Sequence, residues 1–334
     1  MDFTKALDKR RKRTATTIAI LVGFFVICLV ADPKRYIASV YNGMLLFATS
    51  VAPALFPFFF FTRILTSVGT AQILGDALKK PIAKLYNCPS VGGYVFFMSA
   101  ISGYPVGSRL LSDLYSAGIV DGRQVKAISA FTSTSGPLFI VGTVGTVMFK
   151  SASFGYLLMT IHFVSALLNG FIFRISKKKA KKYGELLRTP PDFDDLLGKS
   201  MSSALTSLFI VGGYIAIFSM IADVLTDIGV VSALSAPLSS IYSAIGWEPE
   251  AASGTVVGLI EITRGCQSIA ESGAQIKTAL PVVAGLLSFG GLSVSLQSLT
   301  FLGNCKVSPL YYLATKTTQA AISFALALLV SLFL

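Results

Sequence analysis

Long apolar segments separated by short polar connections run along the chain. Apolar segments of membrane-spanning length lie at about residues 14–31, 40–62, 124–149, 152–175, 200–222, 277–302 and 308–334. A helix needs about 20 apolar residues to cross a bilayer, and in lipid the backbone must pair within the segment, as it does in a helix. The pattern therefore predicts an all-α polytopic membrane protein.

Two further apolar stretches, at about 91–117 and 252–272, are interrupted near their middles by polar segments that contain glycine. These interruptions are residues 102–109 (SGYPVGSR) and 261–267 (EITRGCQ). Backbone that leaves a helix at membrane depth persists only where protein or a hydrated cavity satisfies its polar groups. We therefore predict two re-entrant helical hairpins, and a matching break in each half of a chain is typical of a transporter's substrate site.

Two of the predicted spans are also broken. Residues 132–137 (TSTSGP) interrupt one span, and residues 288–291 (SFGG) interrupt another. Pro137 lacks an N–H and obstructs the preceding turn, which frees carbonyls for hydroxyl groups or water. Ser293 and Gln297 continue a polar stripe beyond the second break, and we expect Gln297 to face a cavity. Helix packing through small residues is the alternative interpretation of the serines and glycines.

The two halves of the chain resemble each other. Residues 62–74 (TRILTSVGTAQIL) resemble residues 222–234 (ADVLTDIGVVSAL), and later landmarks repeat in the same order. Gly107 corresponds to Gly265, for example, and a glycine-rich break follows each of these positions. This pattern indicates a duplication.

The distribution of lysine and arginine predicts the orientation, because short cytoplasmic loops are enriched in both. The basic runs at 9–13 and 177–182 are then both cytoplasmic, with four spans between them when the hairpins are not counted. The loop after the second span is basic, with Arg63 and Lys84 among its residues, whereas its counterpart, 223–250, has acids and no Lys or Arg. One loop lies inside and the other outside, so the repeats are predicted to be inverted.

Composition narrows the class of protein. The chain has 334 residues, of which 53% are hydrophobic and 13% charged, and this leaves too little polar surface for a soluble domain. Orientation accounts for the net charge of +12, so we expect no nucleic-acid binding. The basic run and the apolar segment at 14–30 resemble a signal peptide, but residues 30–33 (VADP) are a poor cleavage site, which favours a retained helix.

These patterns predict the organisation of the chain. Residues 1–38 form a basic cytosolic N-terminus and first transmembrane helix, 39–175 the first repeat, 176–198 a cytosolic basic linker, and 199–334 the second, inverted repeat. Four dispersed cysteines and a single histidine give no metal or disulfide framework. No catalytic motif is present either, so we expect no enzymatic activity and no cofactor.

The first hairpin offers a potential anion site. Gly103 and Gly107 permit a tight turn between half-helices, while Ser108 and Arg109 lie at the start of the second half-helix. A helix N-terminus presents free N–H groups and positive potential, and Arg109 would assist it. The alternative is a turn at the cytosolic edge, with Arg109 reaching lipid headgroups.

The second hairpin concentrates charge. Glu261 and Arg264 are the only charged residues between 251 and 270, and either one would be costly if unpaired in hydrocarbon. One interpretation is an internal ion pair, three residues apart, that holds the tip together. In the other, Glu261 binds a proton, a cation or a donor group of the solute while Arg264 attracts an anion, and both interpretations can hold together.

Two other features receive a structural interpretation. His162 lies in an apolar span and is expected to have a satisfied core or interhelical role, and the phenylalanine run at 56–61 is expected to be packing or lipid-facing surface. The predicted substrate-binding residues all lie at or near the four breaks. They are Ser102, Gly103, Tyr104, Gly107, Ser108, Arg109, Ser135, Gly136, Glu261, Thr263, Arg264, Gln267, Gly290, Gly291, Ser293 and Gln297.

Several of these motifs are similar to those of a known family. Residues 103–107 (GYPVG), 111–114 (LSDL), 135–142 (SGPLFIVG), 261–263 (EIT) and 289–293 (FGGLS) occur in the order found in the YlbJ-type sporulation integral membrane proteins. The chain resembles this family from about Tyr41 to its C-terminus. The family belongs to the nucleoside-recognition or Gate-domain group.

The resemblance implies a Gate-domain fold similar to the concentrative nucleoside transporters, with two re-entrant hairpins and two broken helices that meet near the bilayer midplane. For sporulation members it also implies passage of dipicolinic acid from the mother cell across the outer forespore membrane. A planar aromatic dicarboxylate would suit Arg109, Arg264 and the hairpin helix ends.

The leading hypothesis is a transporter or facilitator of a small anionic solute such as dipicolinate, which works by alternating access and leaves the coupling proton or cation open. A nucleoside transporter is the first alternative. A non-transporting scaffold or assembly factor in sporulation is the second, and it predicts packed hairpin tips without a cavity. In each case the lipid bilayer is a partner of a multi-pass cell membrane protein with a cytoplasmic N-terminus, and the oligomeric state stays open.

Overall fold

The computed structural model describes residues 2–68, 77–78, 80–82, 84–174 and 195–334, and within them all regular structure is helical. In this part of the chain, five helical stretches are long and apolar enough to cross a membrane: Pro33–Leu65, Ala152–Ile172, Leu196–Asp227, Ile276–Cys305 and Pro309–Ser331. The protein is therefore an all-α polytopic membrane protein. Most of the predicted linker, 176–194, lies outside the described residues.

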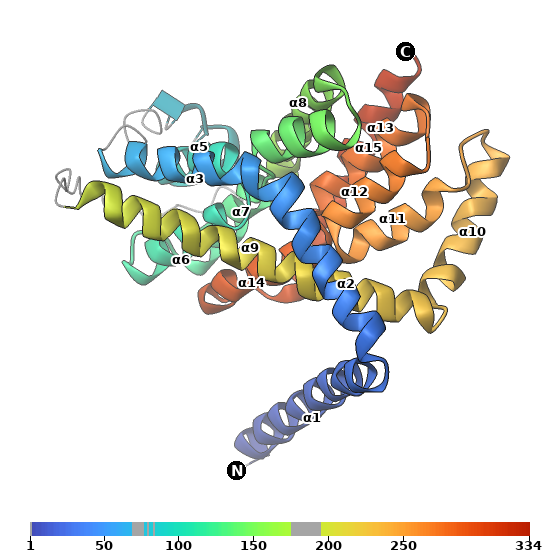
Figure 1. The fold of residues 1–334 in the computed structure, drawn as a ribbon. Coiled ribbons are helices and arrows are strands. Elements are labelled where there is room, and N and C mark those ends of the chain that lie inside the picture. The colour runs from blue at the N-terminus through green and yellow to red at the C-terminus, as the bar shows by residue number, and fades with distance from the viewer. Residues whose placement is uncertain (1, 69–76, 79, 83, 175–194) are drawn as a thin grey trace.

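The N-terminal half begins with α1 (Asp2–Ala31), which projects away from the other helices (Figure 1). A continuous helical stretch follows, formed by α2 (Pro33–Leu46), the π-helix η1 (Phe47–Val51) and α3 (Ala52–Ser67). It starts about seven residues before the predicted position, near 40, because Asp32 caps it. The Asp32 side chain accepts the Arg35 N–H at 3.1 Å, and Pro33 occupies the first helical position.

Short helices then alternate with breaks. A helical hairpin is formed by α5 (Val91–Ser102) and α6 (Val106–Ser116). Next, α7 (Gly122–Thr132) and the π-helix η2 (Leu138–Met148) are separated by a break at 133–137, one residue shorter than the predicted 132–137, and α8 (Ala152–Ile172) ends this half. Both α7 and η2 are too short to cross a bilayer alone.

The C-terminal half repeats this order. It opens with α9 (Leu196–Asp227) and α10 (Val230–Ala244), followed by a second hairpin of α11 (Ala251–Ile260) and α12 (Ile262–Glu271). A second broken helix consists of α13 (Ile276–Phe289) and α14 (Gly291–Leu302). The short η3 (Gly303–Cys305) and the long α15 (Pro309–Ser331) complete the chain.

Each hairpin packs against the broken helix of the other half. Helix α6 contacts α14, and α12 contacts η2. The long α9 crosses α2 and α3 and joins the two sides of the molecule (Figure 1). Where α9 meets α2, Gly43 lies so close to Ser219 that an added Cβ would stand 2.7 Å from the serine Oγ. This arrangement brings all four breaks to the middle of the bundle.

Acidic residues of α9 reinforce these crossings. Asp227 forms an ion pair with Arg35 of α2 and accepts a hydrogen bond from the Tyr36 hydroxyl at 3.1 Å. One helical turn earlier, Asp223 forms an ion pair with Arg264 of α12 at 2.8 Å. Through these two carboxylates, α9 connects the N-terminal helical stretch to the second hairpin.

The second hairpin differs from the prediction in where its backbone breaks. The helices stop at Ile260 and resume at Ile262, so the interruption is Glu261 alone and not the whole 261–267 segment. Gly265 lies inside α12, where it allows that helix to approach Gly258 of α11. The glycine therefore serves close helix packing, which sequence alone does not distinguish from a turn.

We expect Gly265→Ala to destabilise the protein, because its Cβ would overlap the Gly258 Cα, and both helices would have to shift. The expected cost is about 1–3 kcal/mol, measured as a lower unfolding temperature in detergent. Gly213→Ala on α9 is the matched control, because no atom lies within 4 Å of its added Cβ. An unfolding temperature equal to that of the control would contradict this packing.

Candidate functional site at the helix breaks

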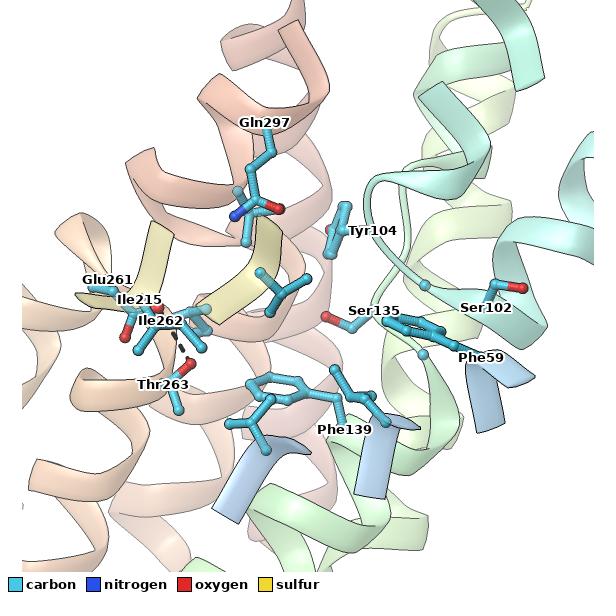
Figure 2. Close-up of a pocket in the computed structure, with 16 residues that line it drawn as sticks. Phe59, Ser102, Tyr104, Ser135, Phe139, Ile215, Glu261, Ile262, Thr263 and Gln297 are labelled. Atoms are coloured by element: carbon cyan, nitrogen blue, oxygen red, sulfur yellow. Dashed lines mark hydrogen bonds between the residues drawn. The ribbon is translucent and has the colours of Figure 1, made fainter. Parts of the chain in front are cut away.

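A cavity of about 60 Å³ lies between the two hairpins and the two broken helices (Figure 2). Both hairpins, both broken helices, α3 and α9 contribute to its walls. The lining residues are Val51, Leu55, Phe59, Ser102, Gly103, Tyr104, Ser135, Gly136, Phe139, Val211, Ile215, Glu261, Ile262, Thr263, Val294 and Gln297. In Figure 2, Glu261 and Thr263 lie across the cavity from Ser102 and Ser135, and Gln297 lies near Tyr104.

The first hairpin places its tip directly on the first broken helix. Helix α5 ends at Ser102, and Gly103 follows with φ of 74°, a conformation that glycine adopts without strain. A Cβ at Gly103 would stand 2.5 Å from the Gly136 nitrogen, so this close approach also requires glycine. The contact brings Tyr104 and Ser135 into the same cavity wall.

The remaining predicted residues of this hairpin do not line the cavity. Gly107 lies in the first turn of α6, where a Cβ would stand 2.5 Å from the Thr132 carbonyl oxygen, and Ser108 is buried beside it. Arg109 is exposed on α6. The predicted role of Arg109 in a shared anion site therefore has no support from this cavity.

Glu261 is buried in the second hairpin because it caps α12. Its Oε2 accepts the Arg264 backbone N–H at 2.8 Å, and its Oε1 accepts the Thr263 hydroxyl at 3.2 Å. The side chain is 1% exposed. These donors at the helix N-terminus offset the cost of removing a carboxylate from water.

Arg264 does not form the side-chain ion pair with Glu261 that was one of the two interpretations of the sequence. Its Nη1 instead lies 2.8 Å from Asp223 Oδ1 and donates to the Ser219 carbonyl at 2.7 Å. The pair with Asp223 is 30% and 27% exposed, so water shares the charges and their desolvation cost is smaller than beside the buried Glu261. Arg264 therefore hydrogen-bonds Glu261 through its backbone N–H and not through its side chain.

A second, larger cavity of about 440 Å³ lies along the other face of α12. Its polar lining on α12 consists of Arg264, Gln267, Ser268 and Glu271, and its opposite wall is formed by α2 and η1. Within it, the Gln267 amide donates to Glu271 at 2.7 Å. The structure thus places the predicted site residues Arg264 and Gln267 here, apart from the residues at the breaks.

The second broken helix contributes an amide to the first cavity. Gly290 and Gly291 have φ of 85° and 73°, which lets the chain turn between α13 and α14 at the cost of only one non-helical residue. Gln297 then faces the cavity, as the sequence predicts. Ser293 is buried but does not line the cavity, and neither do the two glycines.

His162 connects the two broken helices. Its Nε2 accepts the Ser135 backbone N–H at 3.0 Å, so its Nδ1 carries the proton of the neutral ring and donates to the Ser288 hydroxyl at 2.9 Å. The predicted interhelical role of His162 is confirmed. Its partners lie 27 and 126 residues away in sequence, so the pattern of the chain gives no sign of them.

Two features of the site are absent from the sequence prediction. Lys316 of α15 is buried and donates to the Tyr104 hydroxyl, the Ser133 carbonyl and the Gln319 side chain. The available signal was its position as the one charged residue of α15. In addition, Phe59 belongs to the run interpreted as packing or lipid-facing surface, yet it lines the cavity.

The cavity combines apolar walls with a few hydrogen-bonding groups. Glu261 supplies a carboxylate, Gln297 an amide, and Tyr104 and Thr263 hydroxyl groups, while the described residues that line it include no Lys or Arg. Such a site can orient a small, partly apolar molecule through specific polar contacts.

We expect His162→Phe to destabilise the protein, because it leaves the Ser135 N–H and the Ser288 hydroxyl without their shared partner. The expected loss is about 1–3 kcal/mol for each unsatisfied group, measured by thermal unfolding in detergent. Val164→Leu is the control, since its side chain is exposed on the same helix. Equal unfolding temperatures for the two variants would show that the bridge contributes nothing.

Comparisons with known proteins identify a relative by sequence similarity. No protein-family model and no solved structure matches the chain. The chain is 25% identical over 300 residues to the sporulation integral membrane protein YlbJ of Bacillus subtilis (strain 168), a match that covers 84% of this chain and 74% of the relative. The chain is thus a homologue of that protein, and the similarity supports its assignment to the YlbJ-type family.

Proposed function

We propose that this protein is a membrane transporter that moves a small solute by alternating access around the cavity at the helix breaks. The observation that carries the proposal is the meeting of two hairpins and two broken helices at one cavity. Interrupted helices at membrane depth persist only where protein or a hydrated cavity satisfies their free backbone groups, and in secondary transporters such interruptions form the solute and ion sites.

The order of elements supports an inverted repeat of the Gate type. A hairpin, a broken helix and a long helix follow one another as α5–α6, α7–η2 and α8, and again as α11–α12, α13–α14 and α15. We propose that the hairpins are re-entrant, that residues 39–175 and 199–334 are the two repeats, and that the basic N-terminus is cytoplasmic. Movement of one repeat against the other would then expose the cavity to each side in turn.

For the solute, we propose a small anion, with dipicolinate as the leading candidate from the sporulation resemblance. The charge of the cavity constrains how such an anion enters. A carboxylate brought beside the buried Glu261, in a lining without Lys or Arg among the described residues, would be repelled unless a proton or cation accompanies it. We therefore propose that the solute moves together with protons or a cation, and we propose no enzymatic activity.

A nucleoside is the second candidate. The combination of a carboxylate, an amide, hydroxyl groups and the phenylalanine side chains of Phe59 and Phe139 suits an uncharged ring with hydrogen-bonding substituents. The cavity volume of about 60 Å³ is below the roughly 300–1,000 Å³ typical of ligand sites. Either solute therefore requires the cavity to widen, as a transporter does when it opens to one side.

Uptake of labelled dipicolinate and, separately, of a labelled nucleoside into proteoliposomes tests the proposal and separates the candidates. Competition by unlabelled dicarboxylates but not by nucleosides supports the anion, and the reverse pattern supports the nucleoside. A scaffold without transport gives no uptake of either solute above empty liposomes, and this result would overturn the proposal.

We expect Glu261→Gln to reduce flux by about tenfold or more, since roughly 1.4 kcal/mol lost at the site has this effect. The remaining flux should no longer depend on an imposed proton or cation gradient. The amide oxygen can still accept the Arg264 N–H, so the helix cap is retained. Glu250→Gln, an exposed acid before α11, is the control, and a similar loss in that variant would contradict a specific role for Glu261.

We also expect Gln297→Leu to reduce flux by about tenfold, because it removes a hydrogen-bonding group from the cavity lining. By contrast, Arg109→Gln should change flux by less than about twofold, since that side chain is exposed outside the cavity. Initial uptake rates at equal protein incorporation measure both. A large loss of flux in Arg109→Gln, with little loss in Gln297→Leu, would show that Arg109 belongs to the solute site.

A further inference from the structure

Lys316 is the one charged residue of α15. Its side chain is 1% exposed in the middle of α15, which packs against α13 and α8. An ammonium in such a position is costly unless its protons are satisfied. Among the described residues, no carboxylate lies within ion-pair distance of it.

Uncharged oxygens satisfy the ammonium in place of a carboxylate. Nζ donates to the Tyr104 hydroxyl at 2.6 Å, the Ser133 carbonyl at 2.7 Å and the Gln319 Oε1 at 2.7 Å. These acceptors come from the tip of the first hairpin, the break after α7, and α15 itself. The same ammonium lies 5.0 Å from the centroid of the Tyr104 ring, on the side of its hydroxyl group. We call these three oxygens the oxygen cage.

The position of the cage explains why it attracts positive charge. Ser133 is the C-cap of α7, where unpaired carbonyls and the helix dipole favour a cation. Neutral carbonyl and hydroxyl oxygens that replace hydration are also how proteins hold monovalent metal ions at membrane depth. An ammonium group carries the same single positive charge as these metal ions, and both bind to carbonyl and hydroxyl oxygens.

We propose that the oxygen cage is a monovalent-cation site, built between the first hairpin and the first broken helix, which the chain fills with its own Lys316 ammonium. The tethered cation closes the hairpin tip against the break without an ion from solution. Removal of the side chain then leaves a vacancy that a small monovalent cation, such as Na⁺, K⁺ or methylammonium, occupies. The cage shares Tyr104 with the lining of the cavity at the breaks, and its role as a cation site goes beyond the proposed transport function.

Thermal unfolding of purified Lys316→Ala in different salts tests the proposal without any transport assay. In choline chloride, whose cation is too large for the vacancy, we expect the unfolding temperature to fall by roughly 5 °C or more. Sodium, potassium or methylammonium chloride at equal ionic strength should restore about half of this loss or more, with a saturable dependence on concentration. The wild-type protein should show no such preference among the salts.

Three variants distinguish a cation site from a general effect of salt. Lys277→Ala removes an exposed lysine and should show no selective stabilisation. Lys316→Met fills the volume without supplying a donor, so it should be destabilised and should not recover with any cation. The double variant Lys316→Ala with Gln319→Leu lacks one oxygen of the cage and should need at least about tenfold more cation for the same recovery.

Equal unfolding temperatures of Lys316→Ala in choline and in the small cations would overturn the proposal, as would a Lys316→Met variant as stable as the wild type. If neither variant folds, Gln319→Leu decides the question, because the lysine is then retained and one acceptor is lost. We expect its unfolding temperature to fall equally in all salts. No fall would show that the cage does not hold the ammonium.

Flux measurements provide a second and separate readout. In proteoliposomes, Lys316→Ala should lose flux in choline chloride and recover it with the cation that restores its unfolding temperature. Stabilisation by cations without any flux in the wild type would retain the cation site and reject the transport proposal. Wild-type flux without cation-dependent stabilisation of Lys316→Ala would retain the transport proposal and reject the cation site.

Discussion

The requirement to satisfy free backbone groups away from water determines the centre of this protein. Four helix breaks meet there, and each exposes amides or carbonyls that a continuous helix would pair. Particular side chains take over these groups: Glu261 accepts the Arg264 N–H, His162 accepts the Ser135 N–H, and Lys316 donates to the Ser133 carbonyl. The main role of these polar side chains is thus to form the hydrogen bonds that the interrupted helices cannot form with their own backbone.

The same contacts connect elements that are distant in sequence. His162 joins the two broken helices, and Lys316 joins α15 to the first hairpin and the first break. A rearrangement that opened the cavity would have to keep these hydrogen bonds intact or replace them with others. A buried polar group left without a partner costs about 1–3 kcal/mol. This constraint favours rigid movement of whole units over local unfolding at the breaks, as the proposed alternating access requires.

The charge of the solute cavity follows from this arrangement. Arg264 pairs with Asp223 at a wetter position, Arg109 is exposed, and Lys316 is enclosed by its own acceptors. Glu261 is therefore the charged residue that lines the cavity. For the proposed anionic solute, this charge makes an accompanying proton or cation part of the proposal, and the same lining suits the nucleoside proposed as the second candidate.

Sequence by itself determined the membrane class, the long helices and the approximate positions of the four breaks, because apolar length, proline and glycine act locally. It made the break of the second hairpin too long, since Gly265 lies inside α12 and only Glu261 is non-helical. It also identified Glu261 and Gln297 as cavity residues and His162 as an interhelical contact. Only the tertiary structure decided which break Lys316 serves, that Phe59 lines the cavity, and that Arg264 pairs with α9 instead of Glu261. Long side chains can turn toward several neighbours, and the choice among them depends on which distant helices pack together and where water remains to share the charge.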